Sequence, residues 1–432
     1  MNRLVIHKLG PITHCELDLS HFTVLTGFQA SGKSTIAKCV FFFRTIKDDL
    51  YRLAIEAEED IAFQTEKKKL TLKQRLIQNL RLKFLKTFGS SWAMDNTMNI
   101  RYTFTEDCWV RVRLKEDTLY ANPNYIYIEF SSSLEVLIND LARTIPADTN
   151  NLTSVARAQL HQKITSFFQD EKEIVYIPAG RSMITLLSDQ LNYIYSTMKE
   201  EQKRSIDYCT QDYIERVLRL KAEFSSGLGG LIEYYSIKTR PDPALVSHVN
   251  ELMKKILKGN YFCRAGEEGL TIDGTDKYVK INYASSGQQE SVWILNLLDY
   301  GMIRAVQTLF IIEEPESHLF PESQKYITEL IALAANQNHS ILLTTHSPYV
   351  LGTLNNLLYA AQAKPDTAEK VSQIIHRSMW LERQRFGAWF IKDGEIENGM
   401  DQDLDLIQNE KIDEISKTIN EDYDSIFDLQ NE

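Results

Sequence analysis

The sequence has no apolar run long enough to span a membrane. Nowhere in its 432 residues does an uninterrupted apolar stretch approach the roughly 18 residues needed to cross the hydrocarbon core. The first residues do not resemble a secretory signal, because their apolar stretch is short and is broken by His7 and Lys8. These absences argue against a membrane protein and predict a cytoplasmic location.

Cysteine is scarce and dispersed along the chain. The five cysteines are Cys15, Cys39, Cys108, Cys209 and Cys263. No two of them form a Cys-x-x-Cys pair, which argues against a zinc site, and their wide spacing argues against a disulfide framework. A reducing compartment fits this pattern.

Positive charge is in deficit overall, but the deficit is confined to one end. The net charge is −11, and residues 393–432 alone hold fourteen acids and two lysines, a net of −12. The first 392 residues are therefore near +1. Within them, residues 67–86 hold eight bases and no acid. This basic stretch is either the solvated side of an amphipathic helix or a contact for a nucleic-acid phosphate backbone.

Strand and helix patterns alternate over most of the chain. A period-two pattern over 98–130 predicts a small antiparallel sheet, and the charged stretch 185–258 predicts a helical insertion. Alternating strands and helices predict an α/β fold with a largely parallel core sheet covered on both faces. The predicted strands of the core are 3–9, 22–26, 173–180, 308–312 and 340–345, and its helices are 33–62, 287–300 and 321–336.

The stretch GFQASGKS at 27–34 follows a predicted strand and opens a predicted helix. In this P-loop pattern the glycines let the backbone point its N–H groups at phosphate oxygens, while the lysine reaches the β- and γ-phosphates and the serine hydroxyl ligates Mg²⁺. The helix N-terminus adds its positive dipole end. The pattern predicts a site for a nucleoside triphosphate, formed by Gly27, Ser31, Gly32, Lys33, Ser34 and Thr35.

Two carboxylates end an apolar strand in TLFIIEEPESHLFP, residues 308–321. Such a pair suits metal-dependent phosphate chemistry, in which one carboxylate belongs to the Mg²⁺ shell and the next orients the attacking water. We assign the first role to Glu313 and the second to Glu314. Ser34 and Glu313 are therefore the predicted magnesium ligands.

Two further segments complete the set of motifs. YASSGQQES at 283–291 is a weak signal by itself, but it lies 28 residues before Glu313, counted from Ser285. LLTTHSPYVL at 342–351 places His346 at the end of a strand, within reach of a γ-phosphate. A lone histidine at a strand end is usually structural, and the strand-helix-strand pattern between Glu314 and His346 favours a functional one.

GFQASGKS, SSGQQE, IIEEPESHLFP and TTHSPYVL, in this order, resemble the motifs of cassette-type (ABC-type) P-loop ATPases related to the heads of SMC proteins, to RecF and to OLD-like AAA proteins. The resemblance implies an ABC-ATPase head that binds ATP and Mg²⁺. It implies Walker A at Lys33 and Ser34, Walker B at Glu313 and the catalytic residues Glu314 and His346. It also implies a signature segment at Ser285, Ser286, Gly287 and Gln288 that contacts the γ-phosphate held by a second subunit.

The chain departs from this group at several positions. Glu313 stands where aspartate is usual, Ser286 stands where the first signature glycine is usual, and Ser317 lies where many relatives carry an aspartate. The glutamine that normally bridges Mg²⁺ cannot be assigned. Arg181, in the IPAGR segment at 177–181, faces either the nucleotide, a partner subunit or solvent.

The motifs suggest a discontinuous ATPase domain over 1–352. Its nucleotide-binding core is 1–62 and 268–352, a lobe with the antiparallel sheet covers 63–180, and a helical insertion or arm covers 181–267. An extension with an acidic tail follows at 353–432.

Effector chemistry is not apparent in the sequence. The Asp-x-Asp pair in DQDLD at 401–405 is not delivered by an apolar strand, as a Toprim nuclease domain would require. The resemblance therefore implies an ATPase that acts as a dimer or higher homo-oligomer and controls a separate effector nuclease. This is the arrangement of Septu-, retron- or PARIS-type antiphage systems. The alternatives are a RecF-like DNA-repair ATPase that binds DNA through 67–86, and a nucleotide-gated scaffold with negligible turnover.

Overall fold

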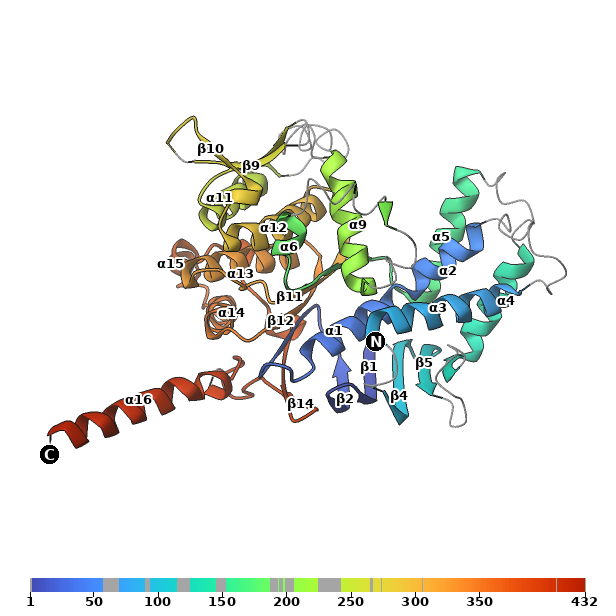
Figure 1. Cartoon of the computed structure of the whole chain (residues 1–432), viewed down its shortest axis with the longest axis horizontal. Coiled ribbons are helices and arrows are strands. Elements are labelled where there is room, and N and C mark those ends of the chain that lie inside the picture. The colour runs from blue at the N-terminus through green and yellow to red at the C-terminus, as the bar shows by residue number, and fades with distance from the viewer. Residues whose placement is uncertain are drawn as a thin grey trace.

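A computed structural model shows the arrangement of the chain (Figure 1). It describes residues 2–56, 70–89, 94–114, 125–144, 153–186, 193, 197–198, 206–223, 242–264, 267–272, 274–304, 306–408 and 410–431. Lys67, Lys68 and Lys69 of the basic stretch and much of the predicted helical arm lie outside these residues.

The strands are β1 (Arg3–Leu9), β2 (Ile12–Asp18), β3 (Phe22–Gly27), β4 (Met94–Thr105), β5 (Cys108–Leu114), β6 (Ile126–Phe130), β7 (Glu173–Ile177), β8 (Tyr261–Arg264), β9 (Glu267–Thr271), β10 (Tyr278–Lys280), β11 (Thr308–Glu313), β12 (Ser340–Thr345), β13 (Phe386–Lys392) and β14 (Glu395–Asn398). The helices are α1 (Lys33–Arg44), α2 (Ile46–Ile55), α3 (Leu72–Phe88), α4 (Ser132–Thr144), α5 (Ser154–Phe168), α6 (Ser182–Leu186), α9 (Tyr208–Glu223), α11 (Pro243–Leu257), α12 (Ser286–Arg304), α13 (Pro321–Asn336), α14 (Pro348–Ala361), α15 (Ala368–Ile374) and α16 (Glu410–Asn431). Short 3-10 helices are Ile281–Tyr283, Arg377–Met379 and Arg383–Arg385.

One large mixed sheet organises the molecule. Across the described residues its strand order is β6-β5-β4-β1-β2-β14-β13-β3-β12-β11-β7. The strands from β13 to β7 run parallel, whereas β6, β5, β4, β1 and β2 pair antiparallel. The predicted α/β fold, with a largely parallel core and a small antiparallel lobe, is confirmed.

The parallel strands are buried on both faces, as strands covered by helices should be. All six residues of β11 are buried. Leu309 and Ile311 join the core that includes α1, α3 and α4, whereas Phe310 and Ile312 join the core that includes α11, α12, α13 and α14. These two groups of helices lie on opposite sides of the view in Figure 1. Packing on both faces fixes the strand ends that carry the motifs.

Local structure differs from the sequence prediction near the N-terminus. The predicted helix 33–62 breaks at Thr45, where the Thr45 hydroxyl donates a hydrogen bond to the carbonyl oxygen of Phe41 (2.7 Å) and α2 begins one residue later. Strand β2 was not predicted, although Ile12, Cys15 and Leu17 are its buried positions. A short strand beside a glycine-containing turn gives too few alternations for a firm prediction.

The core sheet also includes a strand from beyond residue 352. Strand β13 pairs in parallel with β3, with Ala388 opposite Val24, and so lies between β3 and β14. The domain boundaries remain a prediction, but the residues assigned to an extension complete the sheet on one side of the P-loop strand.

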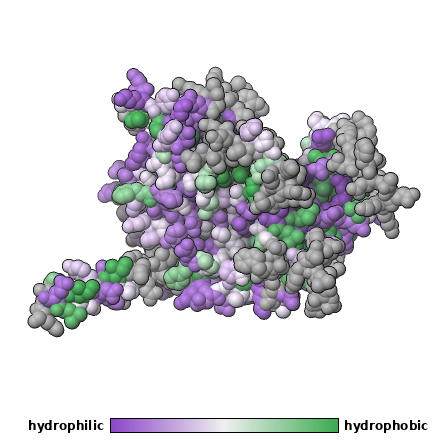
Figure 2. Space-filling model, viewed as in Figure 1, coloured by the Kyte–Doolittle hydropathy of each residue, from purple (hydrophilic) through white to green (hydrophobic). Residues whose placement is uncertain are grey.

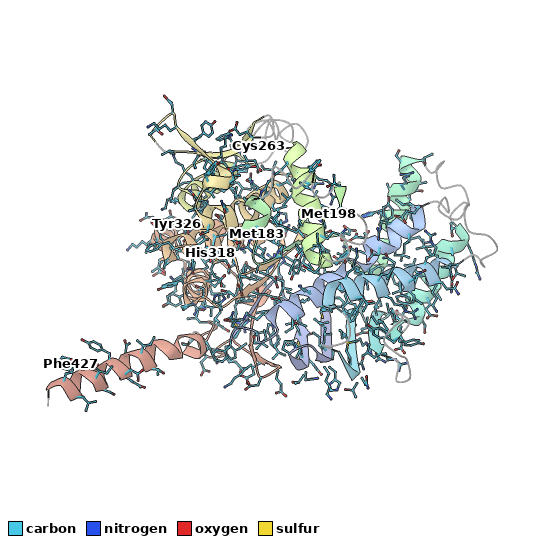
Figure 3. All side chains as sticks on the ribbon, viewed as in Figure 1. Met183, Met198, Cys263, His318, Tyr326 and Phe427 are labelled. Atoms are coloured by element: carbon cyan, nitrogen blue, oxygen red, sulfur yellow. The ribbon has the colours of Figure 1, made fainter. Side chains whose placement is uncertain are left out.

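Helix α16 stands away from the rest of the molecule and ends at the C-terminus (Figure 1). Apolar side chains recur along it in the space-filling view (Figure 2), and Phe427 lies near its far end (Figure 3). Of the helices that the structure describes, none is long and apolar enough to span a membrane. The five cysteines are all buried and free.

Candidate nucleotide-binding site

The P-loop, Walker B and His346 motifs lie at one edge of the parallel sheet. Strands β3, β12, β11 and β7 are parallel neighbours, so their carboxyl ends meet at the same edge, where α/β sheets usually bind ligands. The P-loop follows β3, Glu313 ends β11 and His346 follows β12. The order of the strands thus brings together motifs that are far apart in the sequence.

The P-loop lysine lies at the start of α1, where backbone carbonyl oxygens hold its side chain. The Lys33 ammonium is buried and donates hydrogen bonds to the carbonyl oxygens of Gly27 (2.9 Å) and Phe28 (2.8 Å). Burial lowers the pKa of Lys33, and the carboxylates of Glu314, Glu316 and Glu313 oppose that shift. Among the described residues the hydrogen bonds of this ammonium go to backbone carbonyls, which phosphate oxygens can replace.

The hydroxyl groups of the loop suit a phosphate and its metal. Ser34 is exposed on the first turn of α1, and Thr35 beside it is half-buried. The buried hydroxyl of Ser31 has no hydrogen-bond partner among the described residues. Because an unpaired buried hydroxyl is costly, an acceptor such as a phosphate oxygen is expected there.

Gly27 has a structural role beyond the phosphate cradle. Its φ of 144° lies in a region that favours glycine, and a Cβ atom there would come 2.3 Å from the backbone oxygen of Ile391 in β13. The P-loop strand and β13 therefore approach too closely for any side chain at this position.

We expect Gly27→Ala to destabilise the protein by about 3 kcal/mol, since it adds a backbone clash to the strain of a positive φ. Gly180→Ala is the matched control, because Gly180 also has a positive φ (71°) but a Cβ atom there would meet nothing within 4 Å. Gly180→Ala should lower the free energy of unfolding by only about 1 kcal/mol. Urea unfolding of both variants measures the difference, and equal losses would contradict the clash.

Glu313 has the features of a metal-shell carboxylate. It is 4% exposed at the end of β11. Its Oε2 accepts a weak hydrogen bond from the backbone N–H of Ala179 (3.3 Å), whereas its Oε1 is buried and without a hydrogen-bond partner among the described residues. An orphaned carboxylate oxygen at the same sheet edge as the Ser34 hydroxyl fits the donor set that Mg²⁺ prefers.

Glu314 leaves the strand with its backbone in the left-handed region, at φ 42°. Its backbone N–H donates a hydrogen bond to the carbonyl oxygen of Thr344 in β12 (3.0 Å). Residues other than glycine seldom adopt this conformation, and such strain concentrates at functional sites. The turn directs the Glu314 carboxylate toward His346, with Oε1 3.4 Å from Nδ1.

The Glu314–His346 contact shifts both groups toward their charged forms. The contact with His346 lowers the pKa of Glu314, although burial opposes it. The contact with Glu314 raises the pKa of His346, again against burial, and Glu316 adds to the rise. At neutral pH Glu314 is therefore ionised and able to accept a proton.

Glu316 is a third carboxylate that the sequence interpretation missed. It is 4% exposed, and its Oε1 accepts hydrogen bonds from the Thr345 hydroxyl (2.6 Å) and the backbone N–H of His346 (3.0 Å). It therefore holds the segment that carries His346. The only signal in the sequence was its place two residues after Glu314, in EEPE.

His346 should make stability depend on pH. Because its pKa in the folded protein is raised above the ordinary value of 6.5, its stabilising contribution is present at lower pH and is lost as the pH rises through the raised pKa. His346→Gln should therefore be less stable than the wild type at pH 6, by less than about 1 kcal/mol for so exposed a pair, and should match it more closely at pH 8.5. Urea unfolding at both pH values tests this, with the exposed His7→Gln as control.

The signature segment lies at the start of α12. Ser285 caps this helix, because its hydroxyl accepts a hydrogen bond from the backbone N–H of Gln288 (3.4 Å). In return, the hydroxyl and the backbone N–H of Ser285 lie 3.0 and 2.9 Å from Oε1 of Gln288, and the backbone N–H donates to it. Gln288 Nε2 donates to the carbonyl oxygen of Leu257 (2.7 Å). A Cβ atom on Gly287 would lie 2.6 Å from the backbone oxygen of His318, in the loop after Glu314. Ser285 and Ser286 themselves are exposed.

Arg181 is neither at the surface nor directed at a nucleotide, which corrects all three sequence interpretations. It is fully buried. Its Nη1 donates to the backbone oxygens of Pro178 and Glu313, and its Nη2 donates to that of Glu314 (3.0 Å). Its Nε lies 3.3 Å from Oε2 of Glu290 in α12. Arg181 thus joins the Walker B turn to the signature helix.

Comparison with known proteins identifies the family. The model of the AAA ATPase domain family matches residues 1–351. The chain belongs to this family. No match is found among the curated proteins.

Several solved structures are similar to this AAA ATPase. An Smc head domain from Pyrococcus yayanosii is 11% identical, with a TM-score of 0.40, and covers 96% of this chain and 100% of that one. An Smc head from Pyrococcus furiosus, bound to the C-terminal domain of ScpA, is 12% identical with a TM-score of 0.36, covering 92% and 96%. The SMC head of Thermotoga maritima is 12% identical with a TM-score of 0.33, covering 81% and 90%.

The AAA ATPase has other acidic groups that are not placed for metal chemistry. Residues 401–405 form a turn in which Oδ1 of Asp401 accepts the backbone N–H groups of Asp403 and Leu404. Within the described part of the chain, no group of three or more His, Cys, Asp or Glu side chains is arranged to hold a metal ion.

Proposed function

We propose that this AAA ATPase binds and hydrolyses ATP in composite sites formed between two copies of the chain. Lys33 and the P-loop N–H groups would bind the phosphates, and Ser34 and Glu313 would hold Mg²⁺. Bound Mg²⁺ neutralises charge on the phosphates during hydrolysis. Glu314 would accept a proton from the attacking water, and His346 would position the γ-phosphate.

One observation carries the proposal. The signature residues Ser285 and Ser286 are exposed, and among the described residues no hydrogen bond links them to the P-loop of the same chain. They lie beside the loop that follows Glu314. Their position supports an interaction with a nucleotide held by another copy.

Exposed aromatic side chains beside the motifs support such an interface. Phe28 in the P-loop is 55% exposed, Tyr283 before the signature 77%, Phe320 after Walker B 75% and Tyr349 after His346 55%. Aromatic residues are enriched where protein surfaces associate. One such residue in each motif loop is expected if these loops meet a second copy.

Mixing two inactive variants tests the composite site. Lys33→Ala removes the phosphate-binding lysine, and Ser286→Arg blocks the signature surface without removing the Ser285 cap. Each variant alone should be inactive. An equal mixture should recover about a quarter of the wild-type rate, because half of the dimers are mixed and each has one intact site. If the mixture stays inactive while both variants are folded, sites between copies are excluded.

We further propose that closure of the two copies controls a separate effector, such as a nuclease of an antiphage system, through α16. Ile419, Tyr423, Ile426 and Phe427 are 54–66% exposed and recur at one-turn spacing. Glu421, Asp422 and Asp424 lie between them, and Asp428 follows directly after Phe427. An acidic helix with an apolar face suits a partner with an apolar groove and a basic rim. The product of the neighbouring gene, co-expressed with the chain, should co-purify with the wild type and not with Tyr423→Ser/Phe427→Ser.

DNA binding through residues 67–86 remains the alternative. In the described part of this stretch, however, several basic side chains already have partners within the chain. Lys83 is buried against Asp49, Lys73 pairs with Glu135 (2.7 Å), and Arg81 donates to the carbonyl oxygen of Ile126 (2.8 Å). DNA-stimulated ATP hydrolysis that is lost at high salt would favour this alternative.

A further inference from the structure

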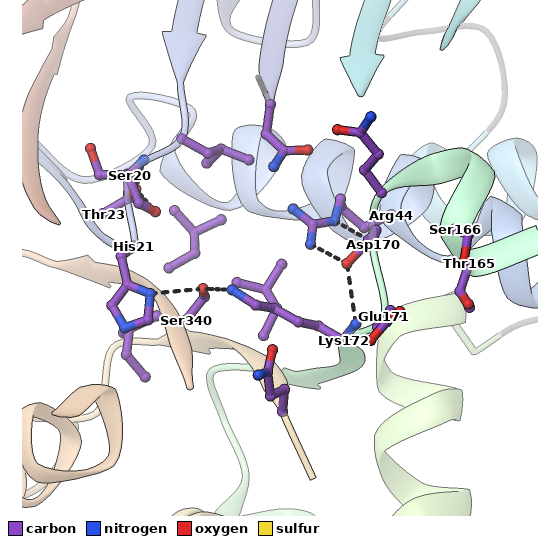
Figure 4. A pocket seen from close by; sticks show the side chains of 17 residues that line it. Ser20, His21, Thr23, Arg44, Thr165, Ser166, Asp170, Glu171, Lys172 and Ser340 are labelled. Atoms are coloured by element: carbon purple, nitrogen blue, oxygen red, sulfur yellow. Dashed lines mark hydrogen bonds and ion pairs between the residues drawn. The ribbon is translucent and has the colours of Figure 1, made fainter. Parts of the chain in front are cut away.

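A polar pocket lies at the opposite edge of the sheet from the nucleotide motifs. It has a volume of about 640 Å³. Its lining includes the residues at the amino ends of the parallel strands, among them His21 before β3, Gln307 before β11 and Ser340 at the start of β12 (Figure 4). The pocket therefore contacts the same strands that carry Lys33, Glu314 and His346 at their other ends.

One carboxylate in this pocket is already neutralised. Asp170 receives two hydrogen bonds from Arg44, both of 2.7 Å, and lies 3.2 Å from the Lys47 ammonium. All three side chains are at most 6% exposed. Arg44 and Asp170 line the pocket, whereas Lys47 contacts Asp170 without lining it. Two cations therefore contact one anion, so Asp170 cannot neutralise further positive charge.

Lys172 adds a cation without a carboxylate partner. Its ammonium donates a hydrogen bond to the Ser340 hydroxyl, and no carboxylate of the described residues lies within ion-pair distance of it. Burial lowers its pKa, and Arg44 lowers it further. The side chain is half-buried and points across the pocket (Figure 4). Glu171, the other acid of the lining, is exposed.

A third side of the pocket also presents hydrogen-bond donors. The Ser340 hydroxyl lies 3.4 Å from Nδ1 of His21. Nε2 of His21 contacts both the carbonyl oxygen of Ala335 and the guanidinium of Arg385, each at 2.9 Å. If Nε2 carries the proton for Ala335, Arg385 gains no acceptor from His21. Arg385 adjoins the pocket through His21 and is not part of its lining, so it adds positive charge beside the site.

We propose that this pocket binds a small phosphorylated molecule, with its phosphate against Lys172 and Ser340. Arg44 and Lys172 line the pocket together with Asp170 and Glu171. Lys47 and Arg385 do not line it, but they contact its lining residues Asp170 and His21. The four cations in and beside the pocket outnumber its two carboxylates, which favours an anion such as a phosphate. The remaining lining is rich in hydroxyl and amide groups (Ser20, Thr23, Thr165, Ser166, Gln169, Gln307), which suits a hydroxylated carrier. The volume lies in the range of small-molecule sites.

Isothermal titration of the full chain, with its P-loop saturated by Mg²⁺ and a non-hydrolysable ATP analogue, tests the proposal. Inorganic phosphate, AMP and ribose are the probes, all at one ionic strength. We expect phosphate and AMP to bind and ribose not to bind. Equal affinity for phosphate and AMP would identify a site for free phosphate, and tighter binding of AMP would identify one for a phosphate ester.

Lys172→Gln should weaken binding at least tenfold. Lys370→Gln, which removes the same charge at an exposed position of α15, should bind as the wild type does. If Lys172→Gln fails to fold, Ser340→Ala, which removes only the hydroxyl, should weaken binding about threefold. Absence of binding by phosphate and AMP, or unchanged binding by a folded Lys172→Gln or Ser340→Ala, overturns the proposal.

Discussion

Replacing Glu314 by glutamine is expected to slow ATP hydrolysis at least about 100-fold and to leave ATP binding intact, since loss of a positioned general base costs about 10²–10⁴ in rate. The contact with His346 lowers the pKa of the Glu314 carboxyl, so it is ionised at neutral pH. Glutamine keeps the shape of the side chain but cannot accept the proton. Steady-state phosphate release and fluorescent-nucleotide binding measure the two effects.

A control variant and a second measurement show whether the effect is specific to Glu314. Glu369→Gln, on the exposed surface of α15, should hydrolyse ATP at the wild-type rate. Because slowed turnover preserves bound ATP, Glu314→Gln should also sediment as a dimer in the presence of Mg²⁺-ATP. A Glu314→Gln variant that keeps near wild-type turnover would remove this residue from the chemistry, and one that stays monomeric with ATP would contradict the composite site.

Replacing Arg181 by methionine is expected to destabilise the protein by about 3–5 kcal/mol, the usual cost of breaking a buried ion pair from one side. The substitution leaves the carboxylate of Glu290, 1% exposed, without its cation. It also removes donors from the backbone oxygens of Glu313 and Glu314. The midpoint of urea unfolding should fall accordingly, and the Walker B turn should lose its link to α12.

An exposed pair provides the control for Arg181. Arg113 pairs with Glu129 at 2.7 Å and is half exposed, so Arg113→Met should cost less than about 1 kcal/mol. Adding Glu290→Gln to Arg181→Met should restore part of the lost stability, because the uncompensated charge is removed. If Arg181→Met is no worse than Arg113→Met, the buried pair does not hold these two segments together.

The motifs could be predicted because their chemistry fixes residue type and local context. The glycines and Lys33 of the P-loop, and the two glutamates after an apolar strand, combine a specific residue with a strand end, and the structure places all of them at one sheet edge. The roles of these residues in catalysis remain predictions. Local pattern also predicted the α/β class, since apolar runs bounded by helices are typical of parallel strands.

Long-range pairing was the part that could not be predicted. Arg181 looked like a surface or ligand-facing residue because its partner, Glu290, is 109 residues away, and nothing near it in sequence indicates burial. Lys83 looked like one base in a solvated row, yet it lies buried between Asp49 and the hydroxyl of Thr45. Both cations can be buried because the fold brings hydrogen-bond acceptors to them from distant parts of the chain.

The position of β3 in the sheet has a consequence for how the protein is made. Its neighbours are β12 and β13, with Val24 opposite Leu343 on one side and Ala388 on the other. Both neighbours are in the last quarter of the chain. A nascent chain on the ribosome therefore carries the P-loop sequence early but has no sheet to support it. Because such non-local pairing is slow to form, the chain should become able to bind nucleotide only when synthesis is nearly complete.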